Sequence, residues 1–107
     1  MKHLIIIAAL ICGSAQAEFK DGNKLFSQMN QYASTDWFNA MGYITGVADT
    51  TYGVLHCAPA NVTGGQLFDM VKSHMESYPG LRHFSADTIV TNVLKTSWPC
   101  PKKGNAL

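Results

Sequence analysis

Charged residues are scarce in this sequence of 107 residues: they make up 14% of the chain, and the formal net charge is only +1. Proteins that bind nucleic acid or anionic lipid electrostatically usually carry a basic stripe or face. The only cluster of like charge is the pair Lys102-Lys103, close to the end of the chain. The composition therefore argues against a nucleic-acid partner.

The sequence also lacks a hydrophobic run long enough to cross a membrane. Its most apolar stretch covers about nine residues, from Leu4 to Cys12, whereas a membrane-spanning helix needs ~20. No later stretch is long or apolar enough, so we expect no stable membrane insertion. Strand-type alternation of polar and apolar residues does not persist beyond a few residues, which argues against a β fold.

The spacings typical of catalytic and metal sites are absent. Neither C-x-x-C nor H-x-x-x-H occurs. His56 and Cys57 are adjacent, but sequence neighbours rarely face each other and a disulfide-bonded sulfur is not a nucleophile. No carboxylate pair for acid–base chemistry is apparent, because Asp49, Asp69 and Asp87 fall in three different predicted helices. We therefore expect no enzyme activity, no metal site and no cofactor.

The first 17 residues have the pattern of a secretion signal. Lys2 and His3 form a short basic start, the apolar run follows, and Ala15-Gln16-Ala17 is a small-x-small cleavage site. We expect cleavage after Ala17 and a mature chain beginning at Glu18, outside the cytoplasm and in the periplasm of a Gram-negative source. An uncleaved N-terminal anchor is the alternative.

Only three cysteines are present, and Cys12 lies in the predicted signal. The remaining pair, Cys57 and Cys100, is most simply a disulfide in an oxidising compartment. Closing this span of 43 residues contributes about 4 kcal/mol in the chain-entropy model, a large share for so small a domain. We expect one domain over residues 18–100 and a frayed tail over 101–107, with Trp98 covering the sulfurs.

Apolar periodicity predicts an all-α fold, a bundle of four helices without internal repeats. In the first helix, capped by Asn23 or Asp21, one face holds Leu25, Phe26, Met29, Tyr32 and Ala33. The second begins at Ser34-Thr35-Asp36 and carries an apolar stripe of about 20 residues from Trp37 to Leu55. Within it, Gly42 and Gly46 lie one turn apart and predict either close approach of a neighbouring helix or a kink.

The third and fourth helices have clear boundaries. Thr63-Gly64-Gly65-Gln66 fits a capping box, in which the Thr63 hydroxyl accepts from the N3 amide and Gln66 reaches back. Tyr78-Pro79-Gly80 ends the third helix, and the half-buried His74 packs on its apolar face. The fourth helix runs from Ser85 to Trp98 and is ended by Pro99.

Five short segments, in order, resemble the Rap/Tai family of type VI secretion immunity proteins. They are Gly42 to Asp49 (family pattern GYIxGVxD), Cys57-Ala58-Pro59 (C-x-P), Val62 to Leu67 (VTxGQL), Tyr78 to His83 (HPExRH) and Trp98-Pro99-Cys100 (WPC). The chain departs from the family pattern at Tyr78 and Gly80, where His and Glu are usual. Met29 and Ala40 stand where members commonly carry a further cysteine pair.

The resemblance implies a periplasmic antitoxin that binds a secreted toxic effector enzyme, typically a peptidoglycan amidase, and blocks its active-site cleft without catalysis. We expect the contact at the connection between the third and fourth helices, which offers an aromatic, an apolar and an arginine side chain. The alternative is that this segment only connects the two helices. The residues of this candidate loop are Tyr78, Pro79, Gly80, Leu81, Arg82 and His83. Family members also tend to form homodimers, for which Trp37, Phe38 and Tyr52 are candidates.

Two other functions fit an exported helical domain of this size. One is a small periplasmic chaperone that acts in acid, although such proteins switch by protonating many carboxylates and this chain has only seven Asp and Glu. The other is an inhibitor of a different cell-wall lytic enzyme, such as a lysozyme. The identity of the bound enzyme distinguishes this last function from immunity.

Overall fold

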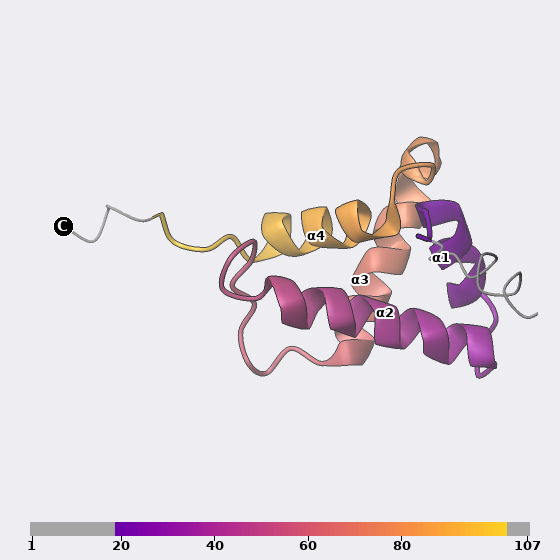
Figure 1. The fold of residues 1–107 in the computed structure, drawn as a ribbon, viewed down its shortest axis with the longest axis horizontal. Helices are drawn as coiled ribbons and strands as arrows, with labels where there is room; N and C mark the ends of the chain where they lie inside the picture. The colour runs from indigo at the N-terminus through magenta and orange to yellow at the C-terminus, as the bar shows by residue number, and fades with distance from the viewer. Residues whose placement is uncertain (1–18, 103–107) are drawn as a thin grey trace, which may run out of the picture.

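The computed structural model describes residues 19–102 and shows a helical domain (Figure 1). Its elements are α1 (Gly22–Met29), α2 (Thr35–Thr51), α3 (Gly64–Ser77), the short 3-10 helix η3 (Pro79–Leu81) and α4 (Ala86–Ser97). No strand occurs within residues 19–102, and Cys57 is bonded to Cys100. The all-α prediction, with four helices and one disulfide, is thereby confirmed. The predicted signal lies outside the described residues.

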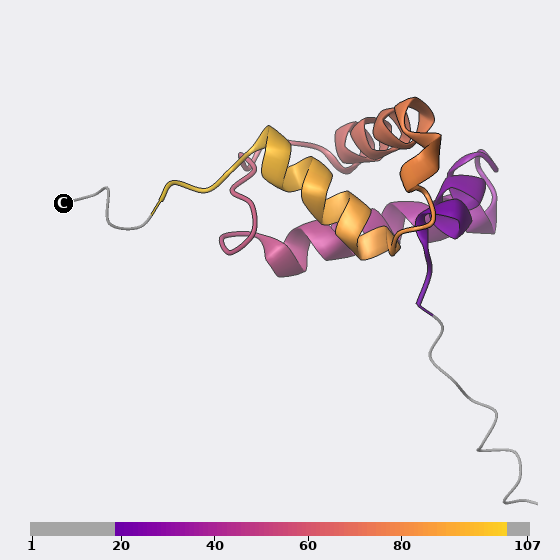
Figure 2. The same ribbon diagram turned by 90° about the horizontal axis from the view of Figure 1, so that it is seen from above.

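All four α-helices pack against one another, and the long helix α2 makes the most extensive contacts with the other three. In Figure 1, α4 lies above α2 and α3 crosses behind both, whereas Figure 2 shows that α4 runs obliquely to α2. The short helix α1 lies beside the N-terminal half of α2. The core consists of the buried side chains Leu25, Met29, Ala40, Ile44, Ala48, Leu67, Phe68, Val71, Met75, Ala86, Ile89, Val90, Val93 and Leu94. Met29 and Ala40, the two positions at which the resemblance implies a further cysteine pair, are both buried in it. None of the helices within residues 19–102 has the length and hydropathy to cross a bilayer.

Three of the helices begin at a side chain that accepts a hydrogen bond from an otherwise unpaired backbone N–H. The pairs are Asp21 Oδ1 with Lys24 N (2.9 Å), Ser34 Oγ with Trp37 N (3.2 Å) and Thr63 Oγ1 with Gln66 N (3.0 Å). The first cap is thus Asp21 and not Asn23. At α4 the Ser85 hydroxyl bonds to Thr88 Oγ1 (2.8 Å) instead of a backbone amide. The local sequence signals therefore set the helix starts correctly.

The first helix is shorter than its apolar pattern predicts. It ends at Met29, with Asn30 as C-cap, so Tyr32 and Ala33 lie in the turn before α2. Ala33 adopts a φ of +61°, a left-handed conformation that reverses the chain, and Tyr32 is exposed. The prediction that these two residues continue the core face was wrong, because the chain must turn here to bring α2 back against α1.

The second helix also ends early. It stops at Thr51, and Leu55 lies in an exposed turn instead of on the apolar stripe. Phe38 points away from the core and is 61% exposed, whereas its neighbour Trp37 packs against the core. The stripe is therefore narrower than predicted, since the fully buried positions of α2 are Ala40, Ile44 and Ala48.

Gly42 and Gly46 are exposed on α2, which is helical throughout. A Cβ atom at either position would meet nothing within 4 Å. The prediction that a neighbouring helix approaches these glycines closely was wrong for the described chain. The close approach is instead at Gly22, where a Cβ would lie 2.6 Å from the carbonyl oxygen of Arg82.

Substituting Gly22 should therefore disturb the domain strongly. The added methyl group of Gly22→Ala would also collide with Ile89, and the Arg82 backbone has little room to move because Gly22 N bonds to Phe84 O (2.8 Å). We expect the free energy of unfolding to fall by ~2–3 kcal/mol, as for overpacked cores.

Chemical denaturation measures the change. The matched control Gly42→Ala should raise stability by ~0.5–1 kcal/mol, since it faces open space in a helix. Equal stability of the two variants would contradict the described contact.

Candidate partner-binding surface

The predicted loop, Tyr78 to His83, connects α3 to α4 and forms a projecting end of the molecule (Figure 1). Its centre is the single turn of η3, in which Leu81 N donates to Tyr78 O (3.0 Å). Tyr78 and Leu81 are 54% and 41% exposed, and the adjacent Phe84 is 47% exposed. The loop and the adjacent Phe84 therefore present three large aromatic or apolar side chains to solvent, and the sequence analysis did not predict Phe84 among them.

Arg82 does not project from this loop but fixes it to the helices. Its Nε donates to the carbonyl oxygen of Met75 (2.8 Å), near the end of α3, and its guanidinium lies 3.9 Å from the ring centroid of Phe26 on α1. Both interactions are intramolecular and hold the cation against the domain. The structure thus separates two roles: Tyr78 and Leu81 are exposed, whereas Arg82 supports the loop on which they stand.

The segment that precedes α1 forms the other support of the loop. Gly22 N donates to Phe84 O (2.8 Å), and Ala86 N donates to Lys20 O (3.0 Å), so the two segments pair in antiparallel fashion around Asp21 and Ser85. These bonds join residues far apart in the sequence. They fix the exit of the loop just before α4 begins.

Lys20 is itself held by three side chains. Its Nζ donates to Gln28 Oε1 (2.6 Å) and Asn39 Oδ1 (2.7 Å), and lies 4.7 Å from the ring centroid of Tyr43. Burial lowers the pKa of Lys20, because desolvation disfavours the charged ammonium. Burial, followed by the nearby charge of Asp87, raises the pKa of Tyr43. The cluster joins the start of the domain to α1 and α2 and has a structural role.

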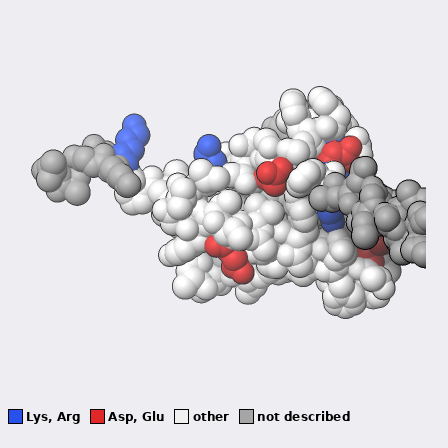
Figure 3. All heavy atoms as spheres, in the orientation of Figure 1, with Lys and Arg blue, Asp and Glu red and all other residues white. Residues whose placement is uncertain are grey.

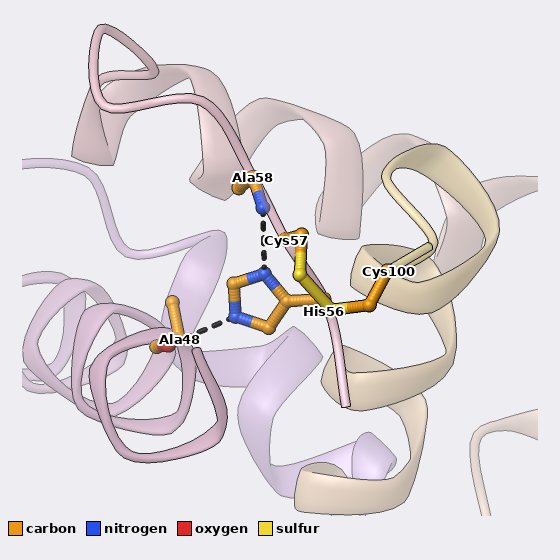
Figure 4. The surroundings of a disulfide bond; sticks show 5 residues. All are labelled: Ala48, His56, Cys57, Ala58 and Cys100. Atoms are coloured by element: carbon orange, nitrogen blue, oxygen red, sulfur yellow. Dashed lines mark hydrogen bonds between the residues drawn. A yellow bond between two sulfur atoms is a disulfide. The ribbon is translucent and has the colours of Figure 1, made fainter. Parts of the chain in front are cut away.

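At the opposite end of the domain, the disulfide joins the segment after α2 to the segment after α4 (Figure 4). Cys57 N also donates to Trp98 O (2.8 Å), and the Trp98 side chain packs partly buried against the core. The two chain segments are thus tied by a covalent bond and a backbone hydrogen bond. Cover of the sulfurs by Trp98 stays a prediction.

His56, next to the disulfide, is a buried residue that the sequence analysis did not recognise as part of the interior. Its side chain is 2% exposed, and both ring nitrogens are hydrogen-bonded (Figure 4). Ala58 N donates to Nδ1 (3.2 Å), which makes Nδ1 the acceptor, so the proton on Nε2 is donated to Ala48 O (2.9 Å). The imidazole therefore bridges the last turns of α2 to the loop after it.

The remaining candidate residues do not assemble into a chemical site. Thr63 and Gln66 lie at the start of α3, where the Thr63 hydroxyl caps the helix. Among residues 19–102, the Gln66 side chain makes no hydrogen bond back to Thr63 N, so only half of the predicted capping box is formed. His74 is half-buried and packs against Tyr78 at 5.0 Å between ring centroids. Within residues 19–102, no three His, Cys, Asp or Glu residues gather as metal ligands would.

The aromatic candidates for dimerisation differ in exposure. Trp37 is partly buried and packs against Phe68, with ring centroids 5.1 Å apart, whereas Phe38 and Tyr52 are each 61% exposed. Figure 3 shows that the face over α2 and α4 carries few and scattered charged side chains. Dimerisation through this region stays a prediction.

A comparison with protein families matches the chain to one of them. The model of the Rap1a immunity proteins covers residues 10–100, which includes the whole helical domain, the disulfide and the loop between α3 and α4. A search of the curated proteins gave no match. Since the match extends over most of the sequence, this chain belongs to the family of Rap1a immunity proteins.

Proposed function

We propose that this protein is a periplasmic immunity protein that neutralises a type VI secretion effector of the peptidoglycan amidase class. It binds the enzyme without catalysis and occludes the active-site cleft. The observation that carries the proposal is the family match over residues 10–100. The disulfide supports an oxidising compartment such as the periplasm, where such a bond persists.

The loop from Tyr78 to His83 is the surface we assign to the effector. A convex loop that is already ordered enters a cleft with little loss of conformational entropy, which leaves more of the contact energy for affinity. The bonds from Arg82 to α3 and from Gly22 to Phe84 supply this order. Tyr78 and Leu81 then act as anchors, because exposed aromatic and apolar side chains desolvate at small cost.

The direct test is neutralisation of candidate cell-wall hydrolases. Each enzyme is directed to the periplasm of a host cell with and without this protein, and survival is measured. Rescue from an amidase supports the proposal, and a stable stoichiometric complex of the two purified proteins identifies the mode of action. Rescue only from a lysozyme would assign the protein to the inhibitors of other lytic enzymes. Suppression of client aggregation at acid pH, without rescue from any hydrolase, would favour a chaperone.

Leu81→Ala tests the assigned loop. We expect it to weaken binding of the neutralised enzyme about 10-fold, which corresponds to ~1.4 kcal/mol, because the anchor loses its apolar contact. Leu55→Ala is the matched control, since Leu55 and Leu81 are each 41% exposed. The segments that hold them, after α2 and after α3, lie at opposite ends of the domain (Figure 1). Calorimetric titration measures both affinities. If the two variants bind equally well, the enzyme contacts another surface.

The variant Arg82→Ala is a less direct test of binding by this loop. Because Arg82 bonds to Met75 O and covers Phe26, Arg82→Ala should reduce thermal stability as well as binding. A loss of binding in Arg82→Ala alone therefore does not identify an anchor. The Leu81 variant is the sharper test, because its side chain is exposed and supports no such bond.

A further inference from the structure

The turn that follows α2 exposes an unusual amount of apolar surface. Tyr52, Val54 and Leu55 occupy three of its four positions, and Val54 is 77% exposed. Single exposed apolar residues are common on protein surfaces, but a contiguous group often marks a contact with another protein. The turn has no part in the loop assigned to the effector, from which it is separated by the length of the domain (Figure 1).

This turn is held in one conformation. Gly53 has a φ of +82°, which its lack of a Cβ permits, and its N–H donates to His56 O (2.8 Å). Leu55 N donates to Thr51 O (2.9 Å), continuing the pattern of the helix. The turn ends at the buried His56, one residue before the disulfide. Its apolar side chains are thus displayed on a rigid base, so a partner need not order the turn on binding.

A groove runs between this turn and the segment from Pro99 to Pro101. Its volume is about 380 Å³, and its apolar walls include Val54, Leu55 and the two prolines. The disulfide and the bond from Cys57 N to Trp98 O fix the distance between the walls. Among residues 19–102, Lys95 is the one charged residue that lines the groove, and no acidic residue of this part of the chain does.

The charge of the groove identifies the kind of occupant. In a contact of this groove with the same groove of a second copy, the described lining residues would offer Lys95 no acidic partner. A different protein with an acidic side chain beside apolar ones complements both the apolar walls and the lysine.

We propose that the groove between the Tyr52–Leu55 turn and Pro99–Pro101 binds an extended segment of a second protein, in which a carboxylate flanked by apolar side chains pairs with Lys95. The segment's apolar side chains lie against Val54 and Leu55. Because the groove and the Tyr78–His83 loop occupy opposite ends, the two surfaces can be engaged at the same time. The protein would then link the effector, bound at the loop, to a second protein, bound in the groove.

Two short peptides test this proposal without knowledge of the natural partner. The first is a capped hexapeptide containing Leu-Glu-Leu, and the second is its Leu-Lys-Leu counterpart. Each is titrated into the oxidised, exported chain while the backbone amide spectrum is recorded. We expect the acidic peptide to shift the amides of Val54, Leu55 and Lys95, and to bind at least fivefold more tightly than the basic one.

Charge reversal provides the decisive variant. Lys95→Glu should invert the preference, so that the basic peptide binds more tightly, while Lys24→Glu, an exposed change on α1, should leave it unaltered. Circular dichroism checks that both variants keep the fold. Equal affinities for the two peptides, shifts confined to other residues, or an unchanged preference in Lys95→Glu would each overturn the proposal. Concentration-dependent shifts at the groove without peptide would assign it to a second copy instead.

Discussion

Replacing Cys57 and Cys100 together by alanine is expected to lower the free energy of unfolding by about 4 kcal/mol, the chain-entropy value for the 43-residue span that the disulfide closes. A domain of this size typically has roughly 5–10 kcal/mol in total, so the variant should be close to unfolding at 37 °C. The bond also fixes the segment after α2 to the segment after α4, which no other covalent link joins. The effect should therefore exceed that of any exposed substitution.

The measurement is denaturant unfolding of both proteins with and without a thiol reductant. Reduction should destabilise the wild-type chain by a similar amount and leave the cysteine-free variant unchanged. This second arm separates loss of the bond from loss of packing around the two sulfurs. A change of less than 1 kcal/mol on reduction, with complete release of two thiols, would contradict the structural role given to the disulfide.

His56→Ala should have the second-largest effect, a loss of about 3 kcal/mol. Removal of the ring takes away the hydrogen bonds to the buried Ala48 O and the half-buried Ala58 N, and each buried group left unpaired costs ~1–3 kcal/mol. The vacated space adds a cavity term unless the turn collapses into it. The exposed His83, changed to alanine, is the matched control and should stay within about 0.5 kcal/mol of wild type.

Two conservative variants, His56→Gln and His56→Asn, separate the contributions of the two ring nitrogens to the free energy of unfolding. Glutamine places an amide N–H near the position of Nε2 and can keep the bond to Ala48 O, whereas asparagine places its oxygen near Nδ1 and can accept from Ala58 N. Each should recover part of the loss seen with alanine. Unfolding free energies near wild type for all three variants would show that the imidazole makes no net contribution.

Both predictions concern the same end of the molecule. His56 and Cys57 are adjacent, one bonded to α2 through Ala48 O and the other to the segment after α4. The turn from Tyr52 to Leu55 directly precedes these two residues in the chain. Loss of either residue should therefore also weaken peptide binding at the groove, while Leu81 and its loop at the far end keep their contacts through Arg82 and Gly22.

The sequence alone was sufficient for those features that depend on near neighbours. Asp21, Ser34 and Thr63 cap their helices because a short polar side chain reaches an amide three residues later, whatever the rest of the chain does. The stop at Tyr78-Pro79 is local for the same reason, since proline lacks the N–H that continues a helix. The pairing of Cys57 with Cys100 followed from the count of cysteines, because only two lie outside the predicted signal and two thiols allow a single bridge.

Apolar periodicity was less reliable, because it states which residues share a face and not where the chain reverses. It carried the first helix through Ala33 and the second through Leu55, although the C-caps are Asn30 and Tyr52. The glycines show the same limit. Gly42 and Gly46 had the spacing of a helix contact and face open space, whereas Gly22 is the position at which two segments meet.

What the sequence by itself determined was a helical, disulfide-bonded domain and the ends of most of its helices, since these follow from hydrogen bonds between residues a few positions apart. Only the tertiary structure decided that Arg82 supports the loop, that His56 is buried, and that Val54 and Lys95 line one groove. The physical reason is that each of these facts depends on residues brought together from separate helices, and their distances are set by packing of the whole chain.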